Sequence, residues 1–110
     1  MRTECNCLMS GPKGAELVRA VGTDETNGRY ADVSIRRCPA CGQLWLRYFV
    51  EYEGFSSSSR WAEGMIDEDR AATMKPEEAA DFLGQLLWCI TGGSAWGGPK
   101  RDTGPFRWDF

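Results

Sequence analysis

Residues 36–42 read Arg-Arg-Cys-Pro-Ala-Cys-Gly. Two cysteines separated by two residues, with Pro between them and Gly after them, are typical of a tight turn that binds a metal ion. A second close pair, Cys5 and Cys7, lies near the start of the chain. Cys5, Cys7, Cys38 and Cys41 together supply four thiolates, which is enough to close a tetrahedral zinc site. We therefore expect a structural zinc ion with no open coordination position, around which the rest of the chain is organised.

The two halves of this predicted site differ in how closely they follow the usual ligand spacing. Cys5 and Cys7 are closer together than most zinc ligands, so a bend at Asn6 is needed to bring their sulfurs together. Four thiolates on one zinc ion also leave a net negative charge. We expect Arg36, Arg37 and nearby backbone amides to offset this charge as a second shell.

The turn at residues 38–42 resembles the knuckles of zinc ribbons and of rubredoxins, with Cys5 and Cys7 as the second pair. The zinc-ribbon resemblance implies a small antiparallel sheet pinned by zinc. The rubredoxin resemblance would imply an iron site that transfers electrons. The chain departs from rubredoxins in its first cysteine pair, its length and its predicted C-terminal helix, so iron is the less favoured metal. The general layout also resembles that of small bacterial immunity and accessory proteins, which is an analogy of plan rather than of motif.

Composition limits the function classes that the chain can belong to. It has 110 residues, five cysteines, no histidine and a formal net charge of −3. This length predicts a single domain over 1–110. Without histidine, a Ser-His or Cys-His nucleophile pair is impossible. We find no signal-peptide core at the N-terminus and no run as long as a membrane span, and we therefore expect a cytoplasmic protein with no membrane partner.

Alternating apolar residues predict four strands before the C-terminal third of the chain, at residues 15–21, 29–37, 43–53 and 60–66. The segment 43–53 is apolar on both faces, which is typical of a central strand with cover on both sides. The strands on either side of the Cys38–Cys41 turn predict a β-hairpin whose tip binds the metal. The residues expected to face inward are Ala31, Val33, Ile35, Leu44, Leu46, Tyr48, Val50 and Tyr52, with Trp45 and Phe49 on the other face of 43–53.

The C-terminal third predicts one amphipathic helix and an aromatic tail. The helix is expected to begin at Pro76 and to end before Gly92, and the fold class is therefore α+β, with sheet plus helix over 1–91. Cys89 reads as an inert core thiol. The tail, 92–110, is too rich in Gly and Pro for regular structure and too aromatic for ordinary disorder, so it either packs on the domain, which we favour, or acts as a recognition segment. The predicted apolar stripe of the helix consists of Ala79, Phe82, Leu83, Leu86, Leu87 and Ile90, with Trp88 on the opposite side, either covered by the chain or exposed for a partner.

Acidic residues concentrate between Glu51 and Asp81, where nine acidic and three basic residues give a net charge of −6. Solvated strand ends and a helix start would explain this run without any function. The functional interpretation is an acidic, aromatic face on a non-enzymatic, zinc-stabilised module that binds another, basic protein, as an inhibitor or immunity-type protein would. The expected contact residues are Glu51, Glu53, Glu63, Asp67, Glu68, Trp88, Trp96 and Trp108.

The sequence also allows two alternatives to protein binding, which are nucleic-acid binding and catalysis. A nucleic-acid-associated zinc ribbon would use a basic, aromatic strip, but the acidic net charge disfavours it. An enzyme would need a carboxylate pair, for example among Glu51, Glu53, Glu63 and Asp67, and nothing in their spacing requires one, so we predict no enzyme. The residues of the basic strip would be Arg29, Arg36, Arg37, Arg47 and Trp45.

Overall fold

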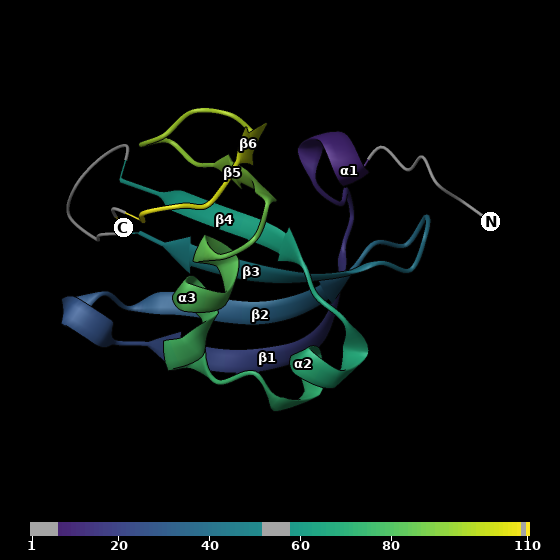
Figure 1. Ribbon diagram of the computed structural model, residues 1–110, viewed down its shortest axis with the longest axis horizontal. Helices are drawn as coiled ribbons and strands as arrows, with labels where there is room; N and C mark the ends of the chain where they lie inside the picture. The colour runs from purple at the N-terminus through teal and green to yellow at the C-terminus, as the bar shows by residue number, and fades with distance from the viewer. Residues whose placement is uncertain (1–6, 52–57, 109) are drawn as a thin grey trace.

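The computed structural model describes residues 7–51, 58–108 and 110, which form one antiparallel sheet with short helices (Figure 1). The six strands lie in the sheet in the same order as in the sequence, and each pairs antiparallel with the next. The strands are β1 (Glu16–Asp24), β2 (Ala31–Arg37), β3 (Leu44–Val50), β4 (Arg60–Met65), β5 (Trp88–Gly92) and β6 (Lys100–Thr103).

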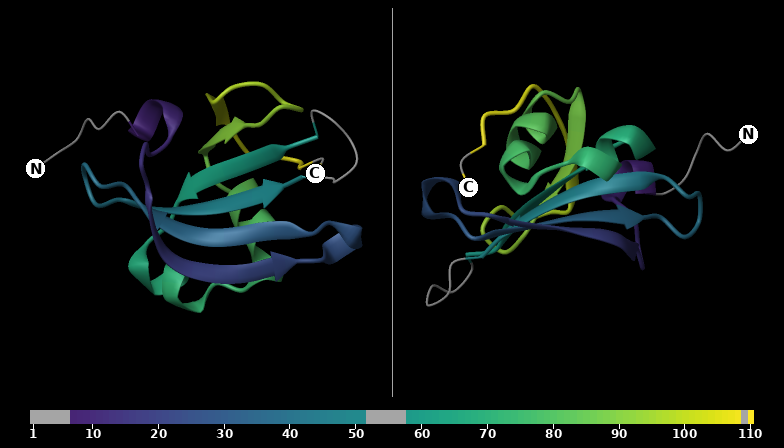
Figure 2. Two further views of the ribbon diagram at one scale, coloured as in Figure 1. Left: turned by 180° about the vertical axis from the view of Figure 1, so that it is seen from behind. Right: turned by 90° about the horizontal axis from the view of Figure 1, so that it is seen from below.

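The helices are all short and lie on both faces of the sheet (Figures 1 and 2). The face that packs against α2 and α3 is called the helical face below. The opposite, rear face carries Trp45, Glu63 and Ile90, and it is contacted by α1 and the segment that leads into β1. The helical segments are α1 (Cys7–Ser10), η1 (Thr26–Gly28), α2 (Glu68–Thr73), η2 (Pro76–Glu78) and α3 (Ala79–Gly84).

The alternation predicted for the central strands is confirmed. Ala31, Val33 and Ile35 of β2 are buried on the helical face, as are Leu46 and Tyr48 of β3. Trp45 is also fully buried, on the rear face, so β3 is covered on both sides as expected for a central strand. Tyr52 lies outside the described residues. The apolar pattern therefore set which face of β2 and β3 points to the main core.

The predicted C-terminal helix is wrong beyond its first half. Helical structure begins at Pro76 as expected, but α3 ends at Gly84, and the chain then becomes strand β5. In β5, Cys89 packs into the core of the helical face while Ile90 packs on the rear face, which is the period of a strand. This apolar segment forms a strand rather than a helix because its backbone pairs with both β4 and β6. The fold is consequently mostly β, rather than α+β with a C-terminal helix.

The aromatic tail packs on the domain, as favoured, but it is not irregular throughout. Part of it forms β6, so the tail contributes a strand to the sheet. Trp96, Phe106 and Trp108 pack against the main core, and Phe110 is buried in it.

The sequence pattern did not predict the helix α2. Asp67 caps this helix by accepting a hydrogen bond of 2.7 Å from the backbone N–H of Arg70.

Candidate metal centre

Three of the four predicted cysteine ligands come together at one end of the sheet. Cys7 begins α1, whereas Cys38 and Cys41 lie at the tip of the β2–β3 hairpin. Their sulfur atoms all lie within 4.8 Å of one another, and the Sγ atoms of Cys7 and Cys41 are 3.6 Å apart. Zinc–sulfur bonds of about 2.3 Å in a tetrahedron place neighbouring sulfurs roughly 3.8 Å apart. The spacing of these thiols therefore suits three corners of a metal site.

The hairpin tip has the backbone of a metal-binding turn. The N–H of Gly42 donates to the carbonyl of Cys38 at 2.8 Å, and the N–H of Cys38 donates to the carbonyl of Gln43 at 3.0 Å. Gly42 has a φ of 81°, a left-handed conformation that glycine adopts without the strain a side chain would add. The Cys-Pro-Ala-Cys-Gly pattern thus folds into the tight loop that the sequence predicted.

The fourth predicted ligand, Cys5, lies outside the described residues. Within residues 7–51, 58–108 and 110, no further cysteine, aspartate or glutamate joins the three thiols. The described part of the site is therefore a group of three thiols that could hold a metal ion. The remaining candidate ligand, Cys5, precedes Cys7 by two positions in the sequence.

The fifth cysteine, Cys89, is separate from this group. It is buried in the main core, and burial, with the nearby charge of Asp102, raises the pKa of its thiol to about 12. A thiol with that pKa is poorly reactive, as expected of a core residue.

A second apolar cluster surrounds the thiols on the rear face. Cys7 and Cys38 are buried together with Trp45 and Ile90. The indole Nε1 of Trp45 has no hydrogen-bond partner among the described residues. This packing ties α1 to the sheet and keeps water away from two of the three sulfurs.

The two arginines expected near the thiolates lie on different faces of the sheet. Arg37 pairs across strands with Leu44 and therefore shares the helical face. Arg36 is on the rear face, where its Nε donates to Ser34 Oγ at 3.2 Å. Only Arg36 is thus on the side of the sheet where Trp45 and the thiols pack.

The acids predicted to contact a partner occupy different environments. Glu51, Asp67 and Glu68 are exposed, whereas Glu53 lies outside the described residues. Glu63 is buried on the rear face and forms an ion pair with Arg47 at 3.6 Å. Burial raises the pKa of Glu63, although the charges of Arg47 and Arg36 oppose that shift. Glu63 is consequently not part of any exposed acidic surface in this fold.

The tryptophans predicted to contact a partner are held by other side chains. Trp88 is on β5 rather than on a helix, and it is covered by the Arg101 guanidinium, which lies 3.9 Å from its ring centroid. Trp96 and Trp108 stack with a centroid distance of 6.2 Å, and Trp108 Nε1 donates to the carbonyl of Ala80 at 2.9 Å. Each of these three rings is therefore at least partly committed to packing within the chain.

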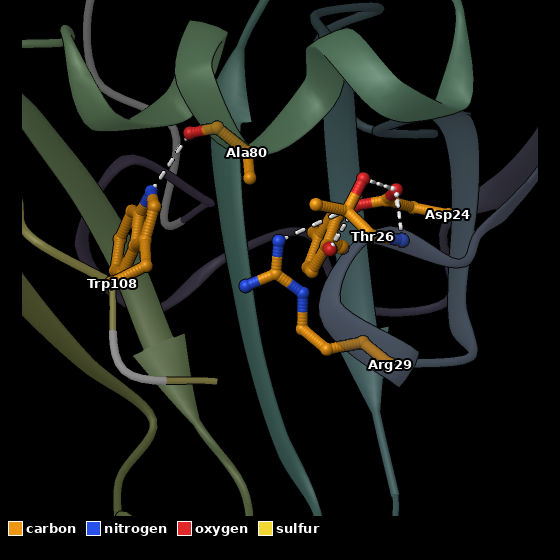
Figure 3. Close-up of polar contacts among 6 residues, drawn as sticks. Asp24, Thr26, Arg29, Ala80 and Trp108 are labelled. Atoms are coloured by element: carbon orange, nitrogen blue, oxygen red, sulfur yellow. Dashed lines mark hydrogen bonds and ion pairs between the residues drawn. The ribbon is translucent and has the colours of Figure 1, made fainter.

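Sequence reasoning missed a buried polar network at the far end of β1 (Figure 3). The carboxylate of Asp24 accepts hydrogen bonds from the hydroxyls of Tyr48 and Thr26 and from the Thr26 backbone, and it lies 3.7 Å from Arg29 Nη2. Burial alone would raise the pKa of Asp24, but these bonds and the arginine outweigh it, so the pKa lies below its ordinary value. Burial and the same carboxylate raise the pKa of Tyr48. The Asp-x-Thr pattern before the Asn-Gly turn was the available signal, since such side chains commonly bond their own backbone.

No protein-family model, curated protein or solved structure matches this chain. Among the described residues, no helix combines the length and the apolar character that crossing a membrane requires. The function must therefore be argued from the chain's own surfaces and chemistry.

Proposed function

We propose that this protein is a non-enzymatic, zinc-stabilised module that binds a basic protein partner through the exposed acids of α2, η2 and α3. The observation that carries the proposal is the placement of six exposed carboxylates on this short stretch of the helical side, against only two basic residues, Arg70 and Lys75. The guanidinium of Arg70 lies 4.9 Å from the ring centroid of Phe82, so it is partly engaged within the chain. The carboxylates, called the acidic ridge below, belong to Asp67, Glu68, Asp69, Glu77, Glu78 and Asp81.

An acidic ridge of this kind would act mainly by electrostatic steering. Clustered charges of one sign raise the rate of encounter with an oppositely charged partner and disfavour partners of the same sign. The aromatic tail packs beside α3, where Trp108 is fixed by Ala80. The ridge and the tail therefore adjoin, which supports the acidic, aromatic surface expected from the sequence.

The proposed metal is zinc, held by Cys7, Cys38, Cys41 and Cys5, and its role is to fasten α1 to the hairpin. All-thiolate ligand sets favour zinc or iron among common metals. Four protein ligands would leave no open position for substrate, so the ion would stabilise the fold rather than react.

The alternative functions receive less support from the geometry. The predicted basic strip does not assemble, because Trp45 is fully buried and Arg37 lies on the opposite face from Arg36 and Arg47. The two buried carboxylates of the described chain, Asp24 and Glu63, also lie on opposite faces. They cannot act as an acid–base pair.

The acidic ridge can be tested with a peptide of alternating Arg and Gly as the cationic probe. Isothermal titration calorimetry at 50 mM and 200 mM salt would compare the wild type with a triple variant, Glu68→Gln, Asp69→Asn and Glu77→Gln. These positions leave the capping residues Asp67 and Glu78 intact. We expect binding to weaken about fivefold to tenfold at the lower salt concentration, because exposed charge pairs contribute a few tenths of a kcal/mol each.

The matched control removes three exposed acids elsewhere, by Glu16→Gln, Glu25→Gln and Asp32→Asn. It has the same net charge as the first triple variant. Equal weakening by both triple variants, or no binding of the peptide to the wild type, would contradict the assignment of the ridge as the binding surface.

A further inference from the structure

A hollow of about 690 Å³ lies between α3 and the C-terminal tail. Its walls come from α3 and Gln85, from residues 105–108 of the tail and from Arg29, which precedes β2. Sites for small ligands commonly have volumes of roughly 300–1,000 Å³ and occur between packed elements. The hollow has the size of such a site, and none of the three thiols of the metal group lines it.

Arg29 is held in place on one side of this hollow. Its Nη2 lies 3.7 Å from the buried carboxylate of Asp24, and its guanidinium carbon lies 5.8 Å from the ring centroids of both Tyr48 and Phe110. Figure 3 shows the guanidinium between the Asp24 network on one side and Trp108 with Ala80 on the other. A guanidinium has five N–H donors. The Nε of Arg29 is buried and has no hydrogen-bond partner among the described residues. The group is thus held by its neighbours, and one of its donors has no partner in the described part of the chain.

A second arginine lines the same hollow from the tail. Arg107 lines it and is exposed. Asp81 and Gln85 lie on the α3 wall, and Asp81 is the one carboxylate among the lining residues, whereas Asp24 pairs with Arg29 from outside the lining. Arginine forks fit the planar oxygens of carboxylates and phosphates, so two arginines in the wall of one hollow suit an anionic ligand.

The remaining wall is aromatic and fixed. Phe106 and Trp108 stack with centroids 4.6 Å apart and an interplanar angle of 5°, and the indole of Trp108 is anchored on Ala80. Gly84 makes this approach possible, since a Cβ there would lie 3.3 Å from both Phe106 O and Trp108 Nε1. An aromatic wall beside two arginines suits a ring that carries an acidic substituent.

We propose that this hollow is a binding site for a small organic anion, a carboxylate or phosphate monoester borne on an aromatic ring. The oxyanion is bound by Arg29 and Arg107, and the ring packs against Phe106 and Trp108. This site goes beyond the proposed protein binding, shares only Asp81 with the acidic ridge, and does not involve the thiols of the metal group.

The test uses the full chain and four probe compounds: benzoate, phenyl phosphate, phenol and inorganic phosphate. Binding is measured by isothermal titration calorimetry and by the NMR shift of the Trp108 indole N–H, assigned with Trp108→Phe. We expect benzoate or phenyl phosphate to bind, and the stronger of the two identifies the preferred oxyanion. Phenol and inorganic phosphate each lack one half of the ligand and should bind at least about tenfold more weakly.

Variants locate the site. Arg107→Gln is expected to weaken binding about tenfold, whereas Arg37→Gln, an exposed arginine away from the hollow, should leave it unchanged. Arg29→Lys keeps a cation beside the buried Asp24 while removing the fork, so it should stay folded and also bind less tightly. The proposal is overturned if neither anion binds, if phenol binds as well as they do, or if Arg107→Gln has no larger effect than Arg37→Gln. The triple variant of the acidic ridge leaves all these lining residues in place and should bind the anion normally.

Discussion

The Sγ atom of Cys7 lies 3.6 Å from the Sγ atom of Cys41, although 34 positions separate the two residues in the chain. This contact joins α1 to the tip of the β2–β3 hairpin, and the apolar cluster of Trp45 and Ile90 packs against the same thiols. A metal ion at this point would close a long loop and hold the N-terminal segment on the rear face. Because ligand capture and folding are coupled in such sites, the thiols should matter to stability far more than their small size suggests.

Removal of one ligand should therefore destabilise the whole domain. We expect Cys41→Ser to lose the metal and to lower the melting temperature by about 10 °C or more, since structural zinc contributes several kcal/mol to folding. Cys89→Ala is the matched control, because this thiol is buried in the main core and away from the metal group. It should retain full metal content in elemental analysis, whatever its effect on packing. A Cys41→Ser protein that melts at the wild-type temperature would show that the site does not organise the fold.

Asp24 should make the protein more stable above its titration range than below it. Its pKa in the folded state lies below the ordinary value of 3.8, so the folded state binds its proton less readily than the unfolded state does. The resulting stabilisation is present above pH 3.8 and is lost as the pH falls through the lower, folded-state pKa. Urea unfolding of the wild type and of Asp24→Asn should differ by about 1–3 kcal/mol at pH 7. The difference should shrink at low pH, and a difference that grows on acidification would contradict the network in Figure 3.

Glu63 should have the opposite pH dependence. Its pKa is raised above 4.5 in the folded state, mainly by burial. The folded state therefore binds this proton more readily, and the associated stability is present below pH 4.5 and is lost as the pH rises through the folded-state pKa. In urea unfolding, the stability of Glu63→Gln relative to the wild type should rise between pH 4.5 and pH 7. A flat relative stability over this range would mean that Glu63 is hydrated rather than buried beside Arg47.

The end of α3 at Gly84 can be tested with two leucines. Leu83 is fully buried, whereas Leu87 is 81% exposed, although a continuous helix would place both on the same apolar stripe. We expect Leu83→Ala to cost about 2–5 kcal/mol of unfolding free energy and Leu87→Ala less than about 0.5 kcal/mol. Comparable losses from the two substitutions would favour the continuous helix over strand β5.

The parts of the fold that sequence could predict are those where local pattern and tertiary structure agree. Ala31, Val33 and Ile35 alternate with polar residues, and the Cys38–Cys41 turn has the Gly that its backbone requires, so the hairpin follows from nearby residues. The segment 85–91 is different, because a short apolar run is compatible with a buried helix or a buried strand. Its state depends on β6, a strand that the Gly- and Pro-rich tail did not reveal.

The candidate sites also differ in how much of them the sequence could predict. Cys7, Cys38 and Cys41 could be grouped by their type and spacing, because few other roles suit paired thiols in a chain without histidine. The burial of Glu63 and the position of Arg29 could not be predicted, since a lone charged residue in a strand has no pattern that distinguishes a buried ion pair from a solvated edge. The hollow beside α3 depends on the early end of that helix, which the apolar stripe concealed.

X-ray absorption at the zinc edge of the purified protein would show whether four thiolates hold one zinc ion. We predict one zinc ion per chain with four sulfur neighbours at about 2.3 Å and no nitrogen or oxygen ligand. That result would also place Cys5 with Cys7, Cys38 and Cys41. A protein that contains no tightly bound metal, that contains iron instead, or whose zinc has fewer than four sulfur neighbours would contradict it.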